Sequence, residues 1–300
     1  MNADETRVMR FGMSTHLFHG DRFARAHVDR LAATGFDLVE VFATRTHINY
    51  HDAAAVAAVG RWLRDAHLKA WSVHLPICDG FTNGIWGRTY SNASADAAVR
   101  TEAIDEARAA VTAARDLGCV MAVLHIGIPH GQPIPPNDND PGAVARSLEP
   151  IARACTDAGI RLALEVIPNA LATPDALLDW LGGELDLGDS GVCLDVGHAH
   201  LVGGVAEAVE SLSGHIITTH IHDNRGTSDD HLVPFDGTID WPATMMEFSK
   251  VGYTGPLIFE LPDHGDADRT LARAVGVRTR IQAILDELQA DYNFELCSFE

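Results

Sequence analysis

Short apolar runs alternate with longer amphipathic runs along most of the chain. Eight of the short runs have the length and the Val, Ile, Leu and Phe content that are typical of buried β-strands. They lie at Val8–His16, Leu38–Phe42, Ala70–Leu75, Val120–Ile126, Leu162–Val166, Gly191–Asp195, Ile216–His222 and Leu257–Leu261. Because strands that are buried on both faces are apolar throughout, this pattern predicts a parallel sheet covered by helices.

The amphipathic runs between these segments have helical periodicity. They lie at Arg22–Thr34, Ala53–Ala66, Ala95–Leu117, Pro141–Ala158, Pro174–Leu181, Val205–Leu212, Trp241–Lys250 and Asp268–Ala290. Thr173 before Pro174 is a typical helix start, and Gly118 is a typical residue just past a helix end. Eight strand–helix units, with no GxGxxG at the first helix, favour a single closed (β/α)8 TIM barrel, an α/β fold, over an open doubly wound sheet.

The length of the chain fits one such domain. A barrel typically needs about 250 residues, and this chain has 300 with 46% hydrophobic content. We therefore expect one TIM-barrel domain over residues 1–300, with the barrel at about 8–290 and a C-terminal tail at 291–300. The apolar segment Tyr292–Phe299 is a candidate contact with a second copy, so a homo-oligomer remains open.

The charge of the chain narrows the range of partners. With 42 acidic and 22 basic residues the formal net charge is −20, and no run of Lys or Arg offsets it. Such a chain should repel nucleic acid. Met1–Glu5 has no signal-peptide features, and no stretch approaches the roughly 18 apolar residues of a membrane span. We expect a cytoplasmic protein that binds no membrane and no nucleic acid.

The five cysteines are scattered, odd in number and without CxxC spacing. This argues against a disulfide framework and against a thiolate metal site. Cys119 and Cys193 stand inside apolar runs, so we interpret them as small buried hydrophobic residues.

Polar side chains recur at the carboxyl ends of the predicted strands, where barrel enzymes assemble their active sites. Several carboxylates and imidazoles that point into one opening would repel one another or stay unsatisfied without a cation. For His16 and Glu40 alone we prefer a structural interpretation. The residues in question are His16, Glu40, His74, His125, Glu165, Asp195, His220 and Glu260.

Three local features extend this picture. His198 follows Asp195 by three residues, so both can face one cavity. His220 and His222 share one face of a strand, and we expect one of the two to point into the barrel. The segment from Gly226 to Asp240 is long and polar enough to cover a site, although for Asp230 and Asp236 we prefer a solvated loop.

As a set, these motifs resemble the xylose-isomerase-like, or AP-endonuclease-2, superfamily of TIM barrels, which includes sugar-phosphate isomerases and epimerases and endonuclease IV. The resemblance covers nearly the whole chain. The segments that carry it are Ser72–Pro76, Val123–Gly127, Leu164–Asn169, Asp195–His200, His220–Asn224, Asp230–Leu232, Gly237–Trp241 and Phe259–Glu260.

The resemblance implies one divalent metal ion with four protein ligands, namely Glu165, Asp195, His220 and Glu260. Three oxygen donors and one imidazole suit Mn²⁺, Mg²⁺ or Co²⁺, with Zn²⁺ as the alternative. It further implies a small-molecule sugar substrate, bound by His74, His125, His198, Arg225 and His231. Arg225 is also a candidate partner for a substrate phosphate.

The activity implied is a metal-dependent sugar or sugar-phosphate isomerase or epimerase. Glu165 and Glu260 would move a proton at the carbon next to a carbonyl, through enediolate chemistry. Ketose 3-epimerases of the superfamily carry a second Glu six residues after the first metal Glu, where this chain has Leu171. This departure weakens the specific interpretation as a ketohexose epimerase. It leaves open the interpretation as a metal-dependent lyase that acts on oxidised (keto) glycosides.

A second interpretation is an endonuclease IV-like phosphodiesterase with three zinc ions. Residue types compatible with all nine of its ligands are present, so ligand counting does not separate the two interpretations. The net charge separates them, because DNA binding depends on neutralising phosphates with basic residues. The acidic chain therefore favours the isomerase interpretation. The nine residues are His74, His125, Glu165, Asp195, His198, His220, Asp229, His231 and Glu260.

Overall fold

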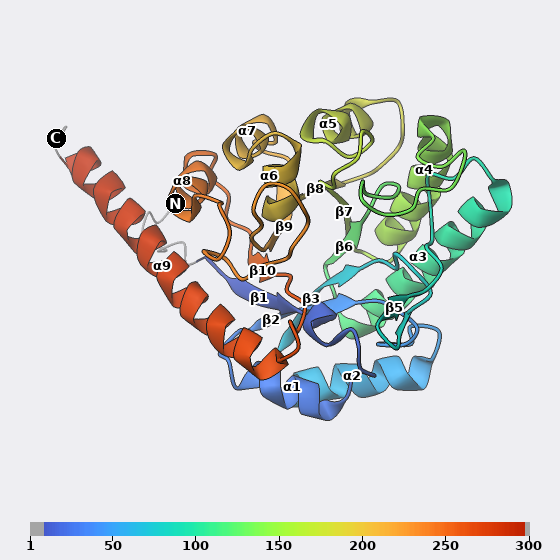
Figure 1. Ribbon diagram of the computed structural model, residues 1–300, viewed down its shortest axis with the longest axis horizontal. Coiled ribbons are helices and arrows are strands. Elements are labelled where there is room, and N and C mark those ends of the chain that lie inside the picture. Colours follow the sequence, from blue (N-terminus) through green and yellow to red (C-terminus); the bar gives the residue numbers. More distant parts are fainter. Residues whose placement is uncertain (1–8, 298–300) are drawn as a thin grey trace.

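A computed structural model describes residues 9–297 of the chain. Its centre is a closed barrel of eight parallel strands in the order β1-β10-β9-β8-β7-β6-β3-β2, with helices around the outside (Figure 1). The predicted (β/α)8 barrel is therefore confirmed. The expectations on Met1–Glu5 and on the last residues of the tail fall outside the described residues.

Each of the eight predicted apolar runs overlaps one barrel strand. Two predictions, β2 and β8, match the observed bounds. The others differ at their ends, where apolar residues continue into the adjoining loops or, in β3 and β7, where the strand begins at a polar residue. The strands are β1 (Phe11–Ser14), β2 (Leu38–Phe42), β3 (Lys69–His74), β6 (Met121–Leu124), β7 (Arg161–Glu165), β8 (Gly191–Asp195), β9 (Ile216–Ile221) and β10 (Leu257–Phe259).

The predicted helices are also present, with shifts of a few residues at their ends. Thr173 caps its helix by accepting a hydrogen bond from the Ala176 N–H, and Gly118 ends another in the left-handed conformation, with φ of 80°. The helices are α1 (Arg25–Ala32), α2 (Ala53–Asp65), α3 (Ala97–Leu117), α4 (Pro141–Asp157), α5 (Pro174–Gly182), α7 (Val205–Ser211), α8 (Trp241–Lys250) and α9 (Ala267–Cys297).

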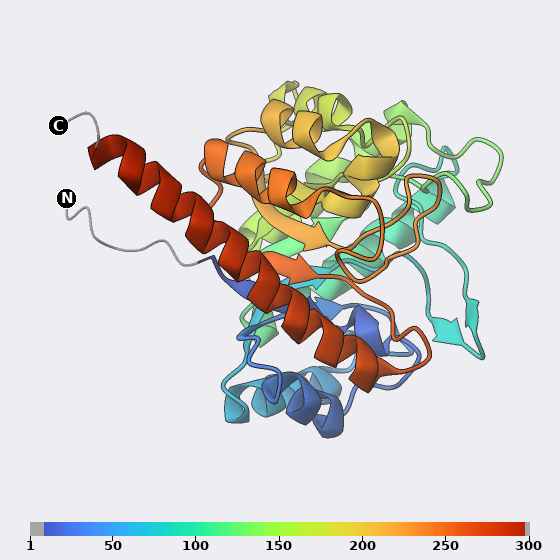
Figure 2. The ribbon, with the colours of Figure 1, turned by 60° about the vertical axis from the view of Figure 1, so that its left-hand side comes forward.

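The last helix differs from the prediction. It runs without a break to Cys297, so the helix expected to end at Ala290 continues into the segment that was expected to be a tail. Leu271, Ala274 and Ile281 are buried along the first part of α9. The later part projects beyond the barrel (Figures 1 and 2).

Three further elements were not predicted, and all lie on loops after strands. A 3-10 helix, η1 (Thr15–Phe18), follows β1, and α6 (Val196–Val202) follows β8 directly. The third is a hairpin of two short antiparallel strands, β4 (Phe81–Thr82) and β5 (Ile85–Trp86), after β3. Figure 2 shows this hairpin standing away from the barrel.

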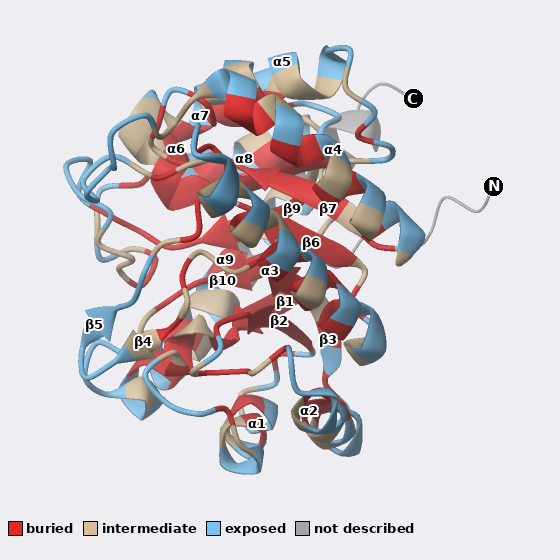
Figure 3. Ribbon diagram, turned by 90° about the vertical axis from the view of Figure 1, so that its right-hand side faces the viewer, coloured by how far each residue is buried: buried red, intermediate tan, exposed pale blue. Residues whose placement is uncertain are grey.

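Burial follows the expected layers. Figure 3 shows buried strands at the centre and helices whose outer faces are exposed. Inside the barrel, Val123, Ala163 and Cys193 form a small cluster of their own, with Ile217 packed against it. No helix in the described part of the chain combines the length and the apolar content that a membrane span requires.

Candidate metal centre

Four side chains from neighbouring strands converge at one end of the barrel. Glu165 ends β7, Asp195 ends β8, His220 lies in β9, and Glu260 follows β10 directly. Each offers an atom that could bind a metal, and these atoms lie within 4.8 Å of one another. The Nδ1 atom of His220 is 2.9 Å from Glu165 Oε1, 3.4 Å from Glu260 Oε2 and 3.9 Å from Asp195 Oδ2.

This group is buried and has spare capacity for a cation. Burial acts to raise the pKa of the Glu165 carboxyl, but the facing His125 and His220 hold that pKa well below its usual value. The Oε2 atom of Glu165 is buried without a hydrogen-bond partner among the described residues, although His125 Nε2 lies 3.0 Å away. Three buried carboxylates with unused lone pairs around one point fit a divalent cation.

His74 and His125 form a second group with Glu165. His74 ends β3, and its Nε2 lies 3.4 Å from Glu165 Oε2, while its Nδ1–H donates to the carbonyl of Leu75 at 2.9 Å. Burial acts to lower the pKa of His74, but the negative charge of the facing Glu165, with Glu260 and Glu40, outweighs it and raises this pKa to about 9. In the absence of a cation, the imidazoles therefore balance the charge of Glu165.

A third group lies beside the first and consists of His198, His222, Asp229 and His231. Asp229 Oδ2 is 3.1 Å from His198 Nε2 and 3.2 Å from His231 Nε2. Partial desolvation acts to raise the pKa of Asp229, but these two histidines keep it far below its usual value. The rings of His222 and His231 stack at 3.8 Å between centroids.

Local backbone features explain how β8 and β9 present these residues. Asp195 caps α6 by accepting a hydrogen bond from the His198 N–H at 2.7 Å, which places His198 above the strand. A Cβ atom at Gly197 would lie 2.0 Å from the ring of His222, so glycine allows that ring to pack against α6. His222 Nε2 is then 3.1 Å from Asp195 Oδ2.

Most of the predicted site residues meet here, with three differences. We expected one of His220 and His222 to point inward, and both do, each fully buried among carboxylates. Arg225 lies apart from the three groups, with a largely exposed guanidinium 3.9 Å from Asp230. Glu40, for which a structural role was preferred, contacts His220, with 2.9 Å between its Oε2 and His220 Nε2.

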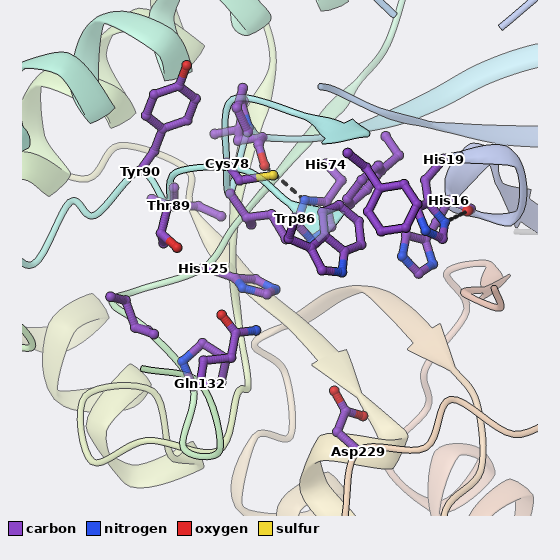
Figure 4. A pocket seen from close by; sticks show the side chains of 18 of the residues that line it. His16, His19, His74, Cys78, Trp86, Thr89, Tyr90, His125, Gln132 and Asp229 are labelled. Atoms are coloured by element: carbon purple, nitrogen blue, oxygen red, sulfur yellow. Dashed lines mark hydrogen bonds between the residues drawn. The ribbon is translucent and has the colours of Figure 1, made fainter. Parts of the chain in front are cut away.

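A cavity of about 690 Å³ opens above these groups. Its lining includes the polar side chains of His74, His125, His198, Asp229, His231 and Glu260 and the aromatic side chains of Phe42, Phe81, Trp86 and Tyr90. Figure 4 shows Trp86 beside His19 and His16, with Asp229 across the opening. The rings of His19 and Trp86 stack at 4.8 Å, so the cavity offers both polar and aromatic contacts.

The fold and this site define a class of protein, namely TIM barrels that gather buried carboxylates and imidazoles at the carboxyl ends of their strands, as divalent-cation sites do. The chain belongs to the xylose isomerase-like TIM barrel family, whose model matches residues 28–284. The resemblance inferred from the sequence is thereby confirmed.

Individual relatives place the chain within a varied family. An uncharacterized protein, MJ1311, of Methanocaldococcus jannaschii is 28% identical over 272 residues, which cover 86% of each chain. The structure of a D-tagatose 3-epimerase-like protein superposes with a TM-score of 0.76 at 24% identity, covering 93% of this chain and 99% of that one. The 3-keto-D-glucoside 4-epimerase YcjR of E. coli superposes with a TM-score of 0.71 at 16% identity, covering 91% and 100%. At these identities the two structures show the shared fold.

Proposed function

We propose that the protein is a divalent-metal-dependent sugar or sugar-phosphate isomerase or epimerase. The observation that carries the proposal is the convergence of Glu165, Asp195, His220 and Glu260 beneath a cavity large enough for a sugar. These four would hold one ion, with Mn²⁺, Mg²⁺ or Co²⁺ favoured by the three carboxylates. We propose that the protein acts in the cytoplasm.

When bound, the ion would polarise a carbonyl and a neighbouring hydroxyl of the sugar and so acidify the hydrogen on the carbon between them. The chain supplies the proton transfer. Glu165 and Glu260 come from β7 and β10, with β8 and β9 between them in the barrel, so they approach a bound sugar from different sides. One carboxylate removes the proton and the other returns it.

The carbon that receives the proton decides the product. Return to the same carbon inverts its configuration, and return to the adjacent carbon shifts the carbonyl. Of the two carboxylates, Glu260 lines the cavity, which suits it to meet the substrate first. Four histidines that line the cavity can donate hydrogen bonds to sugar hydroxyls and to the developing enediolate oxygen, namely His74, His125, His198 and His231.

Two positions bear on the substrate. Leu171, which occupies the position of the second Glu of ketose 3-epimerases, packs in the hydrophobic core, so that residue has no counterpart in the site. This favours a keto sugar other than a ketohexose and keeps the lyase on oxidised glycosides as an alternative. Arg225 would have to leave Asp230 to reach a substrate phosphate, so the four histidines are the better supported substrate ligands.

A second candidate is the endonuclease IV-like phosphodiesterase. The observation that favours it is that the His74–His125–Glu165 and His198–His222–Asp229–His231 groups flank the first one, as a three-metal centre would require. The net charge of −20 opposes it, because binding to duplex DNA relies on phosphate neutralisation. Cleavage of an abasic duplex by metal-loaded protein, abolished in Glu260→Gln, would establish it in place of the isomerase.

The test of the first candidate is isotope exchange. We would incubate Mn²⁺-loaded protein in deuterated water with free and phosphorylated ketoses and with 3-keto-glucosides. Proton abstraction predicts deuterium at the carbon next to the carbonyl, whereas a hydride shift would leave that carbon unlabelled. In Glu260→Gln and in Glu165→Gln the exchange should fall by about 10²-fold or more.

A matched control is Glu106→Gln, since Glu106 is a buried carboxylate of α3 that contacts Arg45, Tyr50 and His51 instead of the site. Its exchange rate should equal that of the wild type. If both site variants exchanged a substrate at the wild-type rate with metal bound, neither carboxylate would be the base and the mechanism would fail.

A further inference from the structure

We propose that Glu40 is a positioning residue that orients His220 for metal binding and fixes which ring nitrogen carries the proton. Glu40 lies in β2, and β1 and β10 separate it from β9, which carries His220. Both side chains are fully buried. Glu40 Oε2 and His220 Nε2 nevertheless lie 2.9 Å apart across the barrel interior.

The two nitrogens of the His220 ring face different partners. The carboxylates of the candidate centre all lie on the Nδ1 side, at 2.9 Å from Glu165, 3.4 Å from Glu260 and 3.9 Å from Asp195. Only one nitrogen of a neutral imidazole has a free lone pair. When Nε2–H donates to Glu40, that lone pair is on Nδ1 and points toward the centre.

The sequence around Glu40 fixes its direction. Side chains alternate along a strand, and Val39 and Val41 pack into the hydrophobic core outside the barrel, so Glu40 points inward. Its neighbour Ser72, paired with it in register on β3, donates Oγ–H to the same Oε2 atom at 2.8 Å. The oxygen that faces His220 is thus held by two donors.

The stability of the folded protein does not explain why the Glu40 carboxylate is buried here. Its other oxygen, Oε1, is buried and has no hydrogen-bond partner in the described part of the chain, and a buried charge with a free lone pair is costly. A carboxylate that accepts from a metal-bound histidine strengthens that histidine as a ligand. Glu40 does not line the cavity, so its role is to act through His220 and not on the substrate.

This inference rests on the proposed metal centre but not on the reaction. The test is the dissociation constant for Mn²⁺, measured by competition with a chelator, in wild-type protein and in Glu40→Gln. Gln has the same shape but no charge, so Mn²⁺ should bind about 10- to 100-fold more weakly. The visible spectrum of the Co²⁺ form should also change, because the ligand field of His220 changes.

Two controls separate positioning from general damage. Glu106→Gln removes a different buried charge and should leave both the Mn²⁺ constant and the Co²⁺ spectrum unchanged. Ser72→Ala removes the second donor to Glu40 but keeps the Glu40–His220 pair, so its effect should be clearly smaller than that of Glu40→Gln. Equal Mn²⁺ constants in Glu40→Gln and wild type would overturn the proposal.

A measurement on the wild-type protein keeps the proposal testable even if Glu40→Gln does not fold. Nitrogen-15 NMR of the Zn²⁺-loaded protein reports the tautomer of each histidine. His220 should carry its proton on Nε2, and a proton on Nδ1 would overturn the inference. If the wild-type protein bound no divalent ion, the metal centre and the proposed function would fail together. A tight wild-type site that is insensitive to Glu40→Gln would refute the role of Glu40 alone.

Discussion

The indole Nε1–H of Trp241 donates to Asp223 Oδ2 at 2.8 Å, and both side chains are fully buried. Asp223 also accepts hydrogen bonds from the N–H groups of Asn224, Phe235 and Ile239. One carboxylate therefore closes the base of the loop that carries Asp229 and His231. The position of these two site residues depends on a side chain that does not itself enter the cavity.

We predict that Asp223→Asn loosens this loop. The amide replaces an acceptor with a donor that faces other donors, and each donor left unsatisfied costs about 1–3 kcal/mol. Urea denaturation should show the loss of stability, and limited proteolysis should show new cleavage between residues 226 and 240. Trp241→Phe removes one donor, which should cost about 1 kcal/mol, and adds a packing loss because Trp241 is fully buried. Equal protease resistance in Asp223→Asn and wild type would contradict the proposed anchoring role.

We predict one tightly bound divalent ion per chain, as the four-residue centre implies. Elemental analysis of purified protein should return one ion, and Asp195→Asn should lose it, because Asp195 supplies one of three carboxylates. Removing the ion with a chelator should lower the melting temperature, since an ion at 100 times its Kd stabilises the folded state by about 2.7 kcal/mol. Three zinc ions per chain would instead indicate the phosphodiesterase.

The architecture could be predicted from the sequence because it depends on local periodicity. The apolar run at Leu38–Phe42 and the amphipathic run at Trp241–Lys250 match β2 and α8 in full, and an aspartate, Asp37 or Asp240, directly precedes each. The hairpin of β4 and β5 was missed because each strand has only two residues, too few for any alternation to appear. The 3-10 helix η1 was missed because its four residues are too few to show a helical period.

The candidate site could be predicted only in part. Glu165 and Asp195 follow from the rule that barrel sites form where strands end. The contact of Glu40 with His220 joins residues 180 positions apart, and no sequence period encodes it. The inward position of His222 depends on the missing Cβ at Gly197, and the outward position of Arg225 depends on Asp230. These are tertiary contacts that a linear pattern does not contain.

The thiols should be unreactive in the folded protein. Cys78, Cys119 and Cys155 are buried and free, and burial raises their pKa to about 11, 12 and 12. The test uses the variant Cys297→Ser, which removes the one cysteine whose side chain is not described. Because the thiolate is the reactive form, a thiol reagent at pH 8 should label none of the three buried thiols in this variant. Denatured protein should be labelled fully. Rapid labelling of the native variant would contradict the burial of these side chains.

The last prediction concerns acid sensitivity and His47, a fully buried side chain between β2 and α2. Its Nδ1–H donates to the Asp21 carbonyl at 2.7 Å, while its Nε2 is buried with no hydrogen-bond partner among residues 9–297. Burial lowers the pKa of His47 from 6.5 to about 4. The unfolded chain therefore binds a proton more readily than the folded one between these two pH values.

The sign of the effect follows from this difference. Stability from His47 is fully present above pH 6.5 and is lost as the pH falls toward 4, by a total on the order of 3 kcal/mol. The Gln side chain of His47→Gln cannot titrate, so the free energy of unfolding of this variant, measured in chelator, should decline less steeply over that range. At pH 7 its free energy of unfolding should be lower than that of the wild type, because packing is lost. His215→Gln, which changes an exposed histidine, should follow the wild-type curve. If His47→Gln declined in parallel with wild type, His47 could not be a source of the acid sensitivity, since every other histidine is common to the two proteins.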